Sequence, residues 1–442
     1  MKAHFSKLAI GLGAASMFLT GSAFAFRDID DRLDALEKGM QEIATRNPQG
    51  TLGAKFANAR PDTNGTRWFM TMDVLYWHPK MGGTEFAIAY TPSDFVSLPP
   101  LIPEAAINHR PKGKMKENDF SWDLGLKVGL GYKTPHDQWD VFARYTWFDS
   151  HSSNSMHKDY PSTIIPLKVN FSNSLNLFFN SQALDIQFYA NHAKSTVDIS
   201  YNNIDLELAR SYFISKNFSV RPHIDIKGAL LDISQKISYL QDRNPDFSGL
   251  ILEFDAVVPE AKVDLSSQMA GLGPRMGLDT KYHLGNGFNI FADVAGSILY
   301  SRFKTSQKDR IPNTKFGGLL PDSILDIFNE VFDLILSAPS RSLKHKFHRF
   351  IPFAQMSLGL EWNTYFNKNK NHLGLKLGYE VQYYWRANQL ENTGNALSNT
   401  TITNVNLENV SISIAPRSRQ DNTHVSNDLM FYGITGEARL DF

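Results

Sequence analysis

Charged side chains recur at every second residue in several apolar segments, and this pattern is the main chemical signal of the sequence. In residues 219–230 and 272–284 the charged residues share one parity, and the opposite parity is mostly apolar. The charged members of these two segments are Arg221, Asp225, Lys227, Arg275, Asp279 and Lys281. A strand with one charged and one apolar face suits a wall between water and lipid, so the predicted chemistry is passage of polar solutes.

The same parity rule, applied to the other alternating segments, predicts a set of charged residues that line a water-filled lumen. The candidates are Asp123, Lys127, Arg144, Arg221, Asp225, Lys227, Arg275, Asp279, Lys281, Glu361, Lys376 and Glu380. Rings of like charge make a pore selective, whereas this set contains both signs. We therefore expect weak ion selectivity.

Motifs typical of enzymes are missing from the sequence. It contains no G-x-S-x-G, H-E-x-x-H, P-loop or dinucleotide-binding fingerprint. The glycine-rich run GLGPRMG lies in an alternating segment, where glycine relieves crowding inside a curved wall. The absence of cysteine excludes thiol catalysis, cysteine-ligated metals and disulfides. We expect no catalytic residue, no cofactor and no bound metal; a membrane-bound hydrolase is the least favoured alternative.

One segment, SRSLKHKFHRF (residues 340–350), is strongly basic. It could contact lipopolysaccharide phosphates, form a positive ring at a pore mouth, or be the solvated stem of a loop. His345 and His348 as a metal pair would lack a third ligand.

The elements that carry these residues are predicted to be long β-strands. In FSWDLGLKVGLGY (120–132) and LGLKLGYEVQYYW (373–385), one parity is wholly apolar and the other holds glycine, charged and other polar residues. Each run has about 13 residues, more than the usual strand and enough to cross a bilayer at a tilt. Similar segments are expected at 66–90, 139–147, 204–213, 219–230, 272–284, 288–300, 354–366 and 429–442.

The connections between these strands alternate in length. Residues 133–138, 215–217, 285–287 and 367–371 are tight turns, whereas 91–119, 151–194, 236–267, 304–350 and 387–427 are expected to be long loops. This alternation is typical of outer-membrane barrels, with short periplasmic turns and long extracellular loops. In lipid every backbone polar group must be paired, so the sheet must close. We predict an all-β transmembrane antiparallel barrel of about 10–12 strands; a soluble sandwich is the alternative.

Aromatic residues near the strand ends are expected to form girdles at the two membrane interfaces. They are Tyr76, Trp77, Trp122, Tyr132, Trp139, Trp147, Trp362, Tyr384 and Trp385. The C-terminal strand ends on an aromatic residue, so Tyr432, Ile434, Leu440 and Phe442 are interpreted as a signal for the barrel-assembly machinery as well as a lipid-facing stripe.

The N-terminal region has the features of an export signal. Residues 1–25 combine a basic start, a short apolar run and an Ala-Phe-Ala site, so cleavage is expected after Ala25. A membrane anchor is the alternative. Residues 26–66 are predicted to form a periplasmic helix, with a short a/d seam over 28–45, and a linker; residues 67–442 form the barrel. Without its leader the chain has 43 basic and 45 acidic residues, which argues against a nucleic-acid partner.

One loop segment has a helical pattern. In residues 321–338, Asp322 can cap a helix whose apolar residues recur every three or four positions. A helix over 322–337 would either narrow the lumen or pack on neighbouring loops.

These strand segments resemble the Legionella-type major outer membrane proteins, pore-forming proteins that also occur in chlamydia-like bacteria. The resemblance is carried by residues 73–89, 120–148, 204–229, 271–278 and 429–442. It implies a bacterial outer-membrane barrel with pore-forming activity and no catalytic residues. The lack of cysteine departs from the disulfide-cross-linked porins of classical chlamydiae.

The sequence therefore predicts an outer-membrane porin for small hydrophilic solutes and ions. The expected partners are outer-membrane lipid, lipopolysaccharide and the assembly machinery, with a homotrimer as one possible assembly. The alternative from another class is a surface adhesin that binds a host or another partner through long loops rich in Asn, Ser and Thr.

Overall fold

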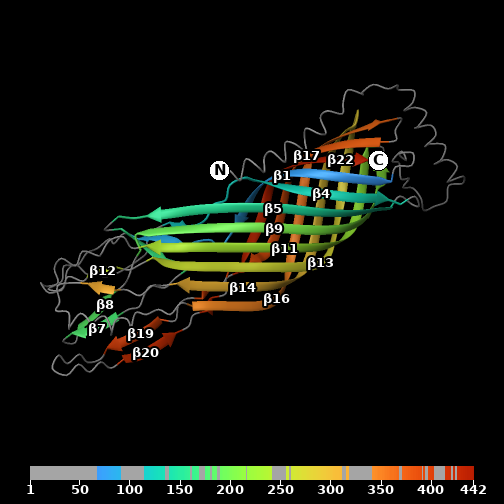
Figure 1. Cartoon of the computed structure of the whole chain (residues 1–442). Helices are drawn as coiled ribbons and strands as arrows, with labels where there is room; N and C mark the ends of the chain where they lie inside the picture. The colour runs from blue at the N-terminus through green and yellow to red at the C-terminus, as the bar shows by residue number, and fades with distance from the viewer. Residues whose placement is uncertain are drawn as a thin grey trace.

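The centre of the computed structural model is a closed antiparallel sheet of ten long strands (Figure 1). The structure describes residues 67–90, 114–134, 139–159, 162–168, 175–179, 182–186, 190–215, 217–240, 255–257, 260–310, 315–317, 341–367, 371–390, 392–393, 397–402, 414–419, 422–423 and 426–442. The ten strands are β1 (Trp68–Met81), β4 (Asp123–Lys133), β5 (Trp139–His157), β9 (His192–Arg210), β11 (Phe218–Leu240), β13 (Ala261–Gly285), β14 (Phe288–Arg310), β16 (Arg341–Phe366), β17 (Asn371–Asn388) and β22 (Asn427–Asp441). The predicted barrel is confirmed, with the lower of the predicted strand numbers.

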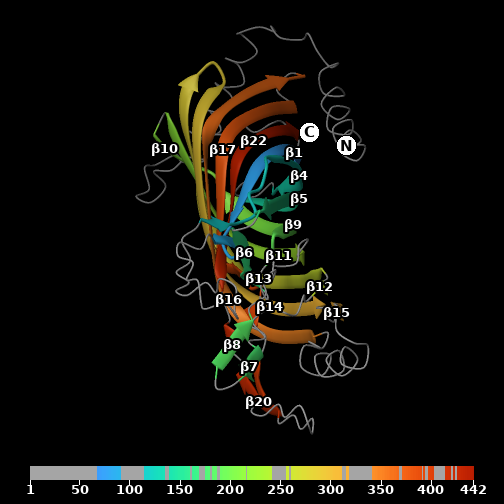
Figure 2. The same ribbon diagram turned by 90° about the vertical axis from the view of Figure 1, so that its left-hand side faces the viewer.

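The barrel closes because the last strand pairs with the first. Each long strand hydrogen-bonds to the next one in sequence, and β22 then pairs with β1 from Phe69–Asp441 to Met81–Leu429. Even the final residue is held, since the Phe442 amide donates to the Trp68 carbonyl at 2.9 Å. The C-terminus therefore does not fray, as the alternation of its sequence predicts. Figure 2, turned by 90°, shows the same wall of curved strands.

The two ends of the barrel differ, as expected. Short connections join β4 to β5, β9 to β11, β13 to β14 and β16 to β17. All of them lie at the end of the barrel where β1 begins and β22 ends. The tightest is Gly285-Asn286-Gly287, where all three residues have positive φ. A Cβ on Gly287 would lie 2.2 Å from the Asn363 carbonyl oxygen, so only glycine fits there.

The long connections at the other end contain short strands of their own. β2 (Ala87–Tyr90), β3 (Met115–Lys116) and β6 (Thr163–Pro166) form one small sheet, and β7 (Leu175–Phe179), β8 (Gln182–Ile186), β19 (Leu397–Ile402) and β20 (Ile414–Arg419) form another. β12 (Asp255–Val257) pairs with β15 (Lys315–Gly317), and β18 (Asn392–Thr393) pairs with β21 (Asn422–Thr423). At the short-turn end, β10 (Tyr212–Ser215) pairs with the start of β11. Among the described residues no helix is long and apolar enough to cross a membrane.

The helices predicted at 28–45 and 322–337 lie outside the described residues, and so does the export signal. They stay predictions.

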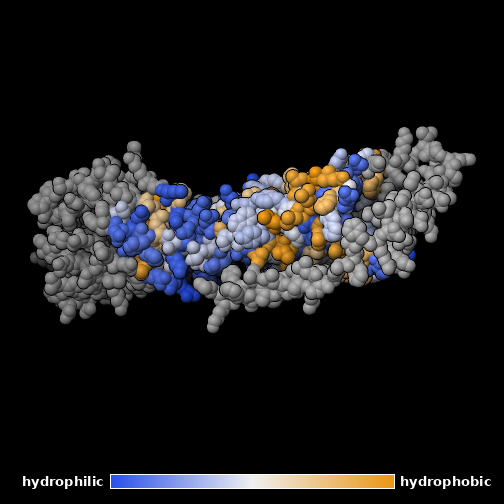
Figure 3. Space-filling model, turned by 90° about the horizontal axis from the view of Figure 1, so that it is seen from above, coloured by the Kyte–Doolittle hydropathy of each residue, from blue (hydrophilic) through white to orange (hydrophobic). Residues whose placement is uncertain are grey.

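An apolar belt surrounds the half of the barrel nearer the short turns. On β11, Pro222, Ile224, Ile226 and Leu230 point outward and are exposed. The nine residues from Pro222 to Leu230, at about 3.4 Å each and tilted by roughly 40°, span about 23 Å, close to the ~25 Å apolar band of outer-membrane barrels. Figure 3 shows this apolar surface in orange on the visible face, with hydrophilic surface beyond it toward the long loops.

Beyond the belt the two faces of the longest strands change character. On β11, Leu231, Ile233 and Ile237 point inward and are 2% exposed, while Asp232 and Lys236 point outward. The outer faces of β13 and β14 also turn polar beyond Leu272 and Tyr300, and Met269, Leu265 and Phe303 lie on their inner faces. The wall therefore continues out of the lipid as a water-facing barrel with an apolar interior.

This extension corrects the predicted loops. Parts of 151–194, 236–267 and 304–350 were expected to be irregular, but they form the outer portions of β5, β9, β11, β13, β14 and β16. The apolar residues shift from the outward to the inward positions where two of them adjoin, as at Leu230-Leu231. A search for apolar residues at one fixed parity therefore ends the strand at that point.

Two of the predicted girdle residues lie inside the barrel. Trp77 and Tyr384 are 0% and 1% exposed and face the lumen. Other predicted members do face outward: Trp122 stacks on Tyr76 with ring centroids 5.3 Å apart, and Tyr132 lies 5.0 Å from Trp68 at the short-turn end. The girdle prediction is thus correct for the outward-facing residues such as Trp122 and Tyr132, and wrong for Trp77 and Tyr384.

A charge placed in the belt should cost more than the same charge on the extended wall. Ile226→Arg should destabilise the barrel by about 2–4 kcal/mol, because arginine near the bilayer midplane loses its hydration. Ser234→Arg, on the same face of β11 but beyond the belt, is the control and should change the free energy of unfolding by less than ~0.5 kcal/mol. Urea titrations in lipid vesicles measure both, and equal losses would contradict the assigned position of the belt.

Candidate functional site in the barrel lumen

The twelve charged residues selected from the sequence all lie on the inner face of the barrel. They come from β4, β5, β11, β13, β16 and β17. Six of them are at most 4% exposed: Lys127, Asp225, Lys227, Arg275, Glu361 and Glu380. The structure thus brings residues far apart in sequence into one interior. That they line an open pore stays a prediction, because many of them pair with one another across the lumen.

A polar cavity occupies the half of the lumen nearer the short turns. Its volume is about 390 Å³, and it extends from Gly287 and His372 at the turn end to Lys127 and Glu380. Seven basic and six acidic residues line it: Lys127, Arg144, Arg221, Arg275, Lys281, Lys376, Arg439, Asp73, Glu207, Asp279, Asp293, Glu380 and Glu437. We call this cavity the vestibule. Its charges nearly balance, so it carries no strong field of either sign.

An ion pair closes the inner end of the vestibule. The Lys127 ammonium nitrogen lies 2.6 Å from Glu380 Oε2, and both side chains are 4% exposed. Lys127 belongs to β4 and Glu380 to β17, which are separated by β22 and β1, so the pair crosses part of the lumen. Glu380 also accepts hydrogen bonds from Gln355, Gln382 and Thr435 at 2.7–3.0 Å. A buried carboxylate needs this many donors to offset its lost hydration.

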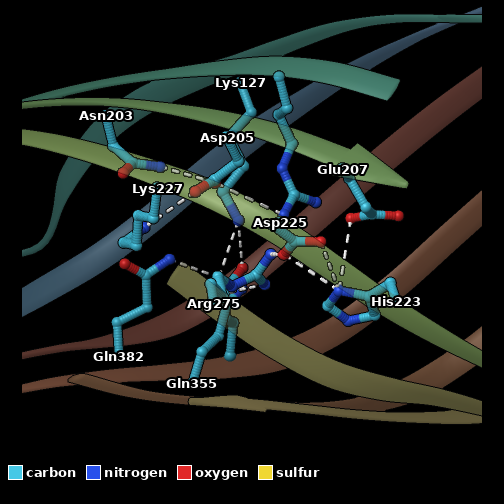
Figure 4. A network of polar contacts seen from close by, with 12 residues as sticks. Lys127, Asn203, Asp205, Glu207, His223, Asp225, Lys227, Arg275, Gln355 and Gln382 are labelled. Atoms are coloured by element: carbon cyan, nitrogen blue, oxygen red, sulfur yellow. Dashed lines mark hydrogen bonds and ion pairs between the residues drawn. The ribbon is translucent and has the colours of Figure 1, made fainter. Parts of the chain in front are cut away.

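A second group of charges completes the same layer (Figure 4). Asp205 accepts from Lys227 at 3.3 Å and from Asn203 at 2.7 Å. Arg275 pairs with Asp225 and donates to Gln355 at 2.9 Å, and Gln355 donates in turn to Glu380. The contacts therefore link β11 to β4 through side chains alone. We call Lys127, Glu380, Asp205, Lys227, Asp225, Arg275 and their amide partners the charge layer.

Aromatic side chains fill the lumen just beyond the charge layer. The hydroxyls of Tyr201 and Tyr384 lie 2.7 Å apart, and Tyr201 also donates to Gln382 at 3.2 Å. β9 and β17 are five places apart in the ring of ten strands, so this contact spans the full diameter. Phe431 packs on Tyr201 and on Trp77, with ring centroids 5.0 and 5.9 Å apart. These four residues are the aromatic layer.

The far half of the lumen is an apolar core sealed by an inserted loop. Leu231, Val263 and Phe303, among many others, belong to one buried cluster with the aromatic layer. From the loop after β1, Phe86 enters this cluster, and its carbonyl oxygen accepts from the Tyr239 hydroxyl at 2.7 Å. Among the described residues, this buried cluster and the inserted loop lie between the vestibule and the loop end.

A neighbouring loop fastens the insertion. The backbone amide of Leu167 donates to the Phe86 carbonyl at 3.1 Å, and Lys168 donates to the Gly83 carbonyl at 3.0 Å. Burial lowers the pKa of the Lys168 ammonium group, and the negative charge of Glu85 partly offsets that effect. The inserted segment is thus held by backbone pairing and by one half-buried cation.

A histidine-centred cluster in the vestibule has ligand types that could hold a metal. Glu207, His223 and Asp225 offer ligand atoms within 4.8 Å of one another. However, Arg221 already pairs with Glu207, and Arg275 pairs with Asp225. Two guanidinium groups beside the carboxylates would repel a divalent ion, so the geometry favours a hydrogen-bonded network.

Several lumen residues were missed by the analysis of the sequence. Asp205 and Glu207 follow the same two-residue alternation in residues 204–213 as the selected residues, so the pattern would have found them. Tyr201 lies in an uncharged part of β9 among serine and asparagine, and nothing local marks it as a lumen residue.

The basic segment before residue 351 is a strand, not a loop stem. Lys344, Lys346 and His348 lie on the outer face of β16, and His345 lies on the inner face opposite Thr305. The two histidines therefore cannot share a metal, and a basic ring at the pore mouth is excluded for the three outward residues.

The sequence matches the family described as Legionella pneumophila major outer membrane protein precursor over residues 60–440. The chain belongs to this family. Family membership and the closed barrel place the protein in the outer membrane, as the resemblance implied. No curated protein matches the chain.

Several solved structures are similar to this family member at low sequence identity. The outer membrane protease OmpT of Escherichia coli is 10% identical, with a TM-score of 0.34, and the match covers 89% of this chain and 99% of OmpT. A Pseudomonas aeruginosa FadL homologue is 8% identical (TM-score 0.24; 85% and 90% covered), and the Ralstonia pickettii toluene transporter TbuX is 9% identical (TM-score 0.24; 86% and 90% covered).

Removing one member of the central ion pair should destabilise the barrel more than removing both. Glu380→Met leaves Lys127 buried without its partner and should cost about 3 kcal/mol. The double variant Lys127→Met, Glu380→Met removes the unpaired charge and should recover a large part of that loss. Urea unfolding in vesicles tests this, and a double variant that is as unstable as the sum of the single variants would contradict a direct pair.

Proposed function

We propose that this protein is a narrow, gated pore for small hydrophilic solutes and ions. The observation that supports this most is the vestibule, a polar cavity of about 390 Å³ that reaches into the lumen from the short-turn end and stops on side chains. Side chains can rotate away without breaking the hydrogen-bonded wall, whereas the strands cannot move apart in lipid. The charge layer and the aromatic layer together form the gate.

The strand number limits the size of the open state. A barrel of about eight strands is just wide enough for its own side chains, and barrels of about 16 strands hold an aqueous channel. Ten strands lie near the narrow end, so the open pore admits only small solutes and its conductance is low. With charges of both signs along the vestibule, we expect weak ion selectivity.

Opening the aromatic layer should raise the conductance. Tyr384→Ala removes the hydroxyl that contacts Tyr201 and the ring that crosses the lumen, so the open probability in planar bilayers should increase severalfold. Tyr383→Ala is the matched control, because Tyr383 is the same residue type on the same strand and its hydroxyl contacts Asp428 outside the lumen. Full-length protein without any conductance above the lipid background, both as wild type and as Tyr384→Ala, would reject the pore.

The charge balance of the vestibule gives a separate test. Reversal potentials across a tenfold salt gradient should lie near zero for a weakly selective pore. A value near the ideal cation or anion limit would contradict the proposed role of the vestibule charges.

A second candidate function is a surface adhesin, favoured by one observation. The small sheet β20-β19-β7-β8 joins the loop between β5 and β9 to the loop between β17 and β22, through parallel pairing of Thr401 and Ile402 with Asn176 and Leu177. In Figure 1 this sheet lies beyond the end of the barrel that carries the long loops. Because the wall already extends out of the membrane, the sheet is presented well away from the lipid. A loop platform of this kind suits contact with another surface.

Deleting the β19–β20 hairpin (residues 397–419) distinguishes the two candidates. An adhesin should lose binding of protein-loaded vesicles to host cells and keep its conductance. Unchanged binding after the deletion, or no binding by the wild type, would exclude adhesion through this sheet.

A further inference from the structure

One stretch of the outer wall carries an exposed cluster of positive charge. It consists of Arg302, Lys304, Lys308, Lys344, Lys346 and His348 on the outer faces of β14 and β16. We call it the basic patch. Because these residues face away from the lumen, neither the proposed gate nor the vestibule uses them.

The register of the two strands places like charges side by side. Lys304 is directly opposite Lys346, and Arg302 is directly opposite His348. Directly opposed residues in an antiparallel pair have Cβ atoms about 5 Å apart, and like charges at this distance destabilise the sheet. An anion between the cations would relieve this repulsion.

The described residues around the patch supply little of that negative charge. On the outer face of β13, Asp264 is opposite Lys308. Asp232 on β11 is separated from Lys304 by Gln268, which lies opposite both residues on the intervening strand β13. Within the described residues, none of the five lysines and arginines of the patch forms an ion pair. On β5 and β9, by contrast, the exposed His151 pairs with Asp198 at 2.6 Å. Exposed lysines also occur elsewhere on the wall, as at Lys194 and Lys236, but there they lie opposite Ser238 and Thr196 and not opposite another cation.

The height of the basic patch matches a membrane interface. Tyr300 and Phe350, whose ring centroids are 5.4 Å apart, form the last aromatic pair of the apolar belt on these strands. The first patch residues follow directly, since His348 stacks on Tyr300 at 5.5 Å and Arg302 is two residues beyond it, about 7 Å along the strand. This edge of the belt faces the long loops, which are extracellular in outer-membrane barrels. Lipid phosphates lie at that height.

We propose that the basic patch binds the phosphate groups of lipopolysaccharide in the outer leaflet. Lysine and arginine form charge-assisted hydrogen bonds with phosphate oxygens, and a phosphate seated between Lys304 and Lys346 relieves their repulsion. Tyr300 and Phe350 contact the acyl region immediately below. This site fixes one side of the barrel to a specific lipid and is independent of pore function.

The experiment compares purified lipids by native mass spectrometry of the refolded full chain in detergent. The probes are bisphosphorylated lipid A, phosphatidylglycerol and inorganic phosphate. The test variant is Lys304→Gln, Lys346→Gln, and the control is Lys194→Gln, Lys236→Gln. The control lysines are also exposed on the outer wall, on β9 and β11, but lie farther from the belt. Heat-modified mobility on gels verifies that each variant is folded.

We expect lipid A to bind the wild type and the control equally, and the test variant about tenfold more weakly, which corresponds to ~1.4 kcal/mol. Binding to the test variant should also depend less on salt. Unchanged affinity of the test variant, or an equal loss in the control, would overturn the site. Phosphatidylglycerol binding as tightly as lipid A, or displacement of lipid A by inorganic phosphate at equal concentration, would overturn the assignment to lipopolysaccharide.

Discussion

Closure of the backbone hydrogen-bond ladder is the constraint on which the rest of the structure depends. An unpaired amide or carbonyl group in hydrocarbon costs several kcal/mol, so a strand edge cannot remain in lipid. Pairing of β22 with both β17 and β1 removes the last two edges. Once the ring is closed, each side chain in the belt must face either lipid or lumen, and the sequence has to satisfy both environments along one strand.

The environment on each side of the wall changes along the strand, and the side chains change with it. In the belt the outside is lipid and the inside is polar; beyond the belt the outside is water and the inside is apolar. Lys227 lies at this boundary, 0% exposed, with its ammonium group 3.3 Å from Asp205 and 4.4 Å from the Phe353 ring. A cation at the junction of a polar and an apolar core needs both the carboxylate and the aromatic face, because no water replaces them.

The part of the fold that was predicted from the sequence is the part that the membrane imposes. Period-two alternation with apolar residues on one parity identified ten strands and the inward direction of Lys127, Asp225 and Glu380. The extended wall was missed because the apolar residues move from the outer to the inner face at Leu230-Leu231. A strand whose apolar face changes in this way looks irregular in the sequence. Trp77 was assigned to the wrong face because an aromatic residue near a strand end suits either a girdle or a core.

Contacts across the lumen could not be derived from the sequence for a different reason. Lys127 and Glu380 are 253 residues apart, and their meeting depends on the number of strands and on the stagger between them. Neither quantity follows from local pattern. Tyr201 and Tyr384 meet only because their strands lie opposite each other in a ring of ten. A ring with two more strands would separate the hydroxyl groups and leave the lumen open.

For the proposed gate, the two halves of the lumen differ in the expected free-energy cost of opening. Charges of the charge layer adjoin the polar vestibule, so water can solvate them when an ion pair separates, and the cost is smaller than in a dry interior. The residues of the aromatic layer and the apolar core gain no hydration when they separate, and an apolar constriction excludes water until it widens. Phe86 seals that region from a loop, and its segment is held by hydrogen bonds to Tyr239 and Leu167. The loop after β1 is therefore the element whose displacement would admit water to the apolar half, while the ten strands keep their pairing.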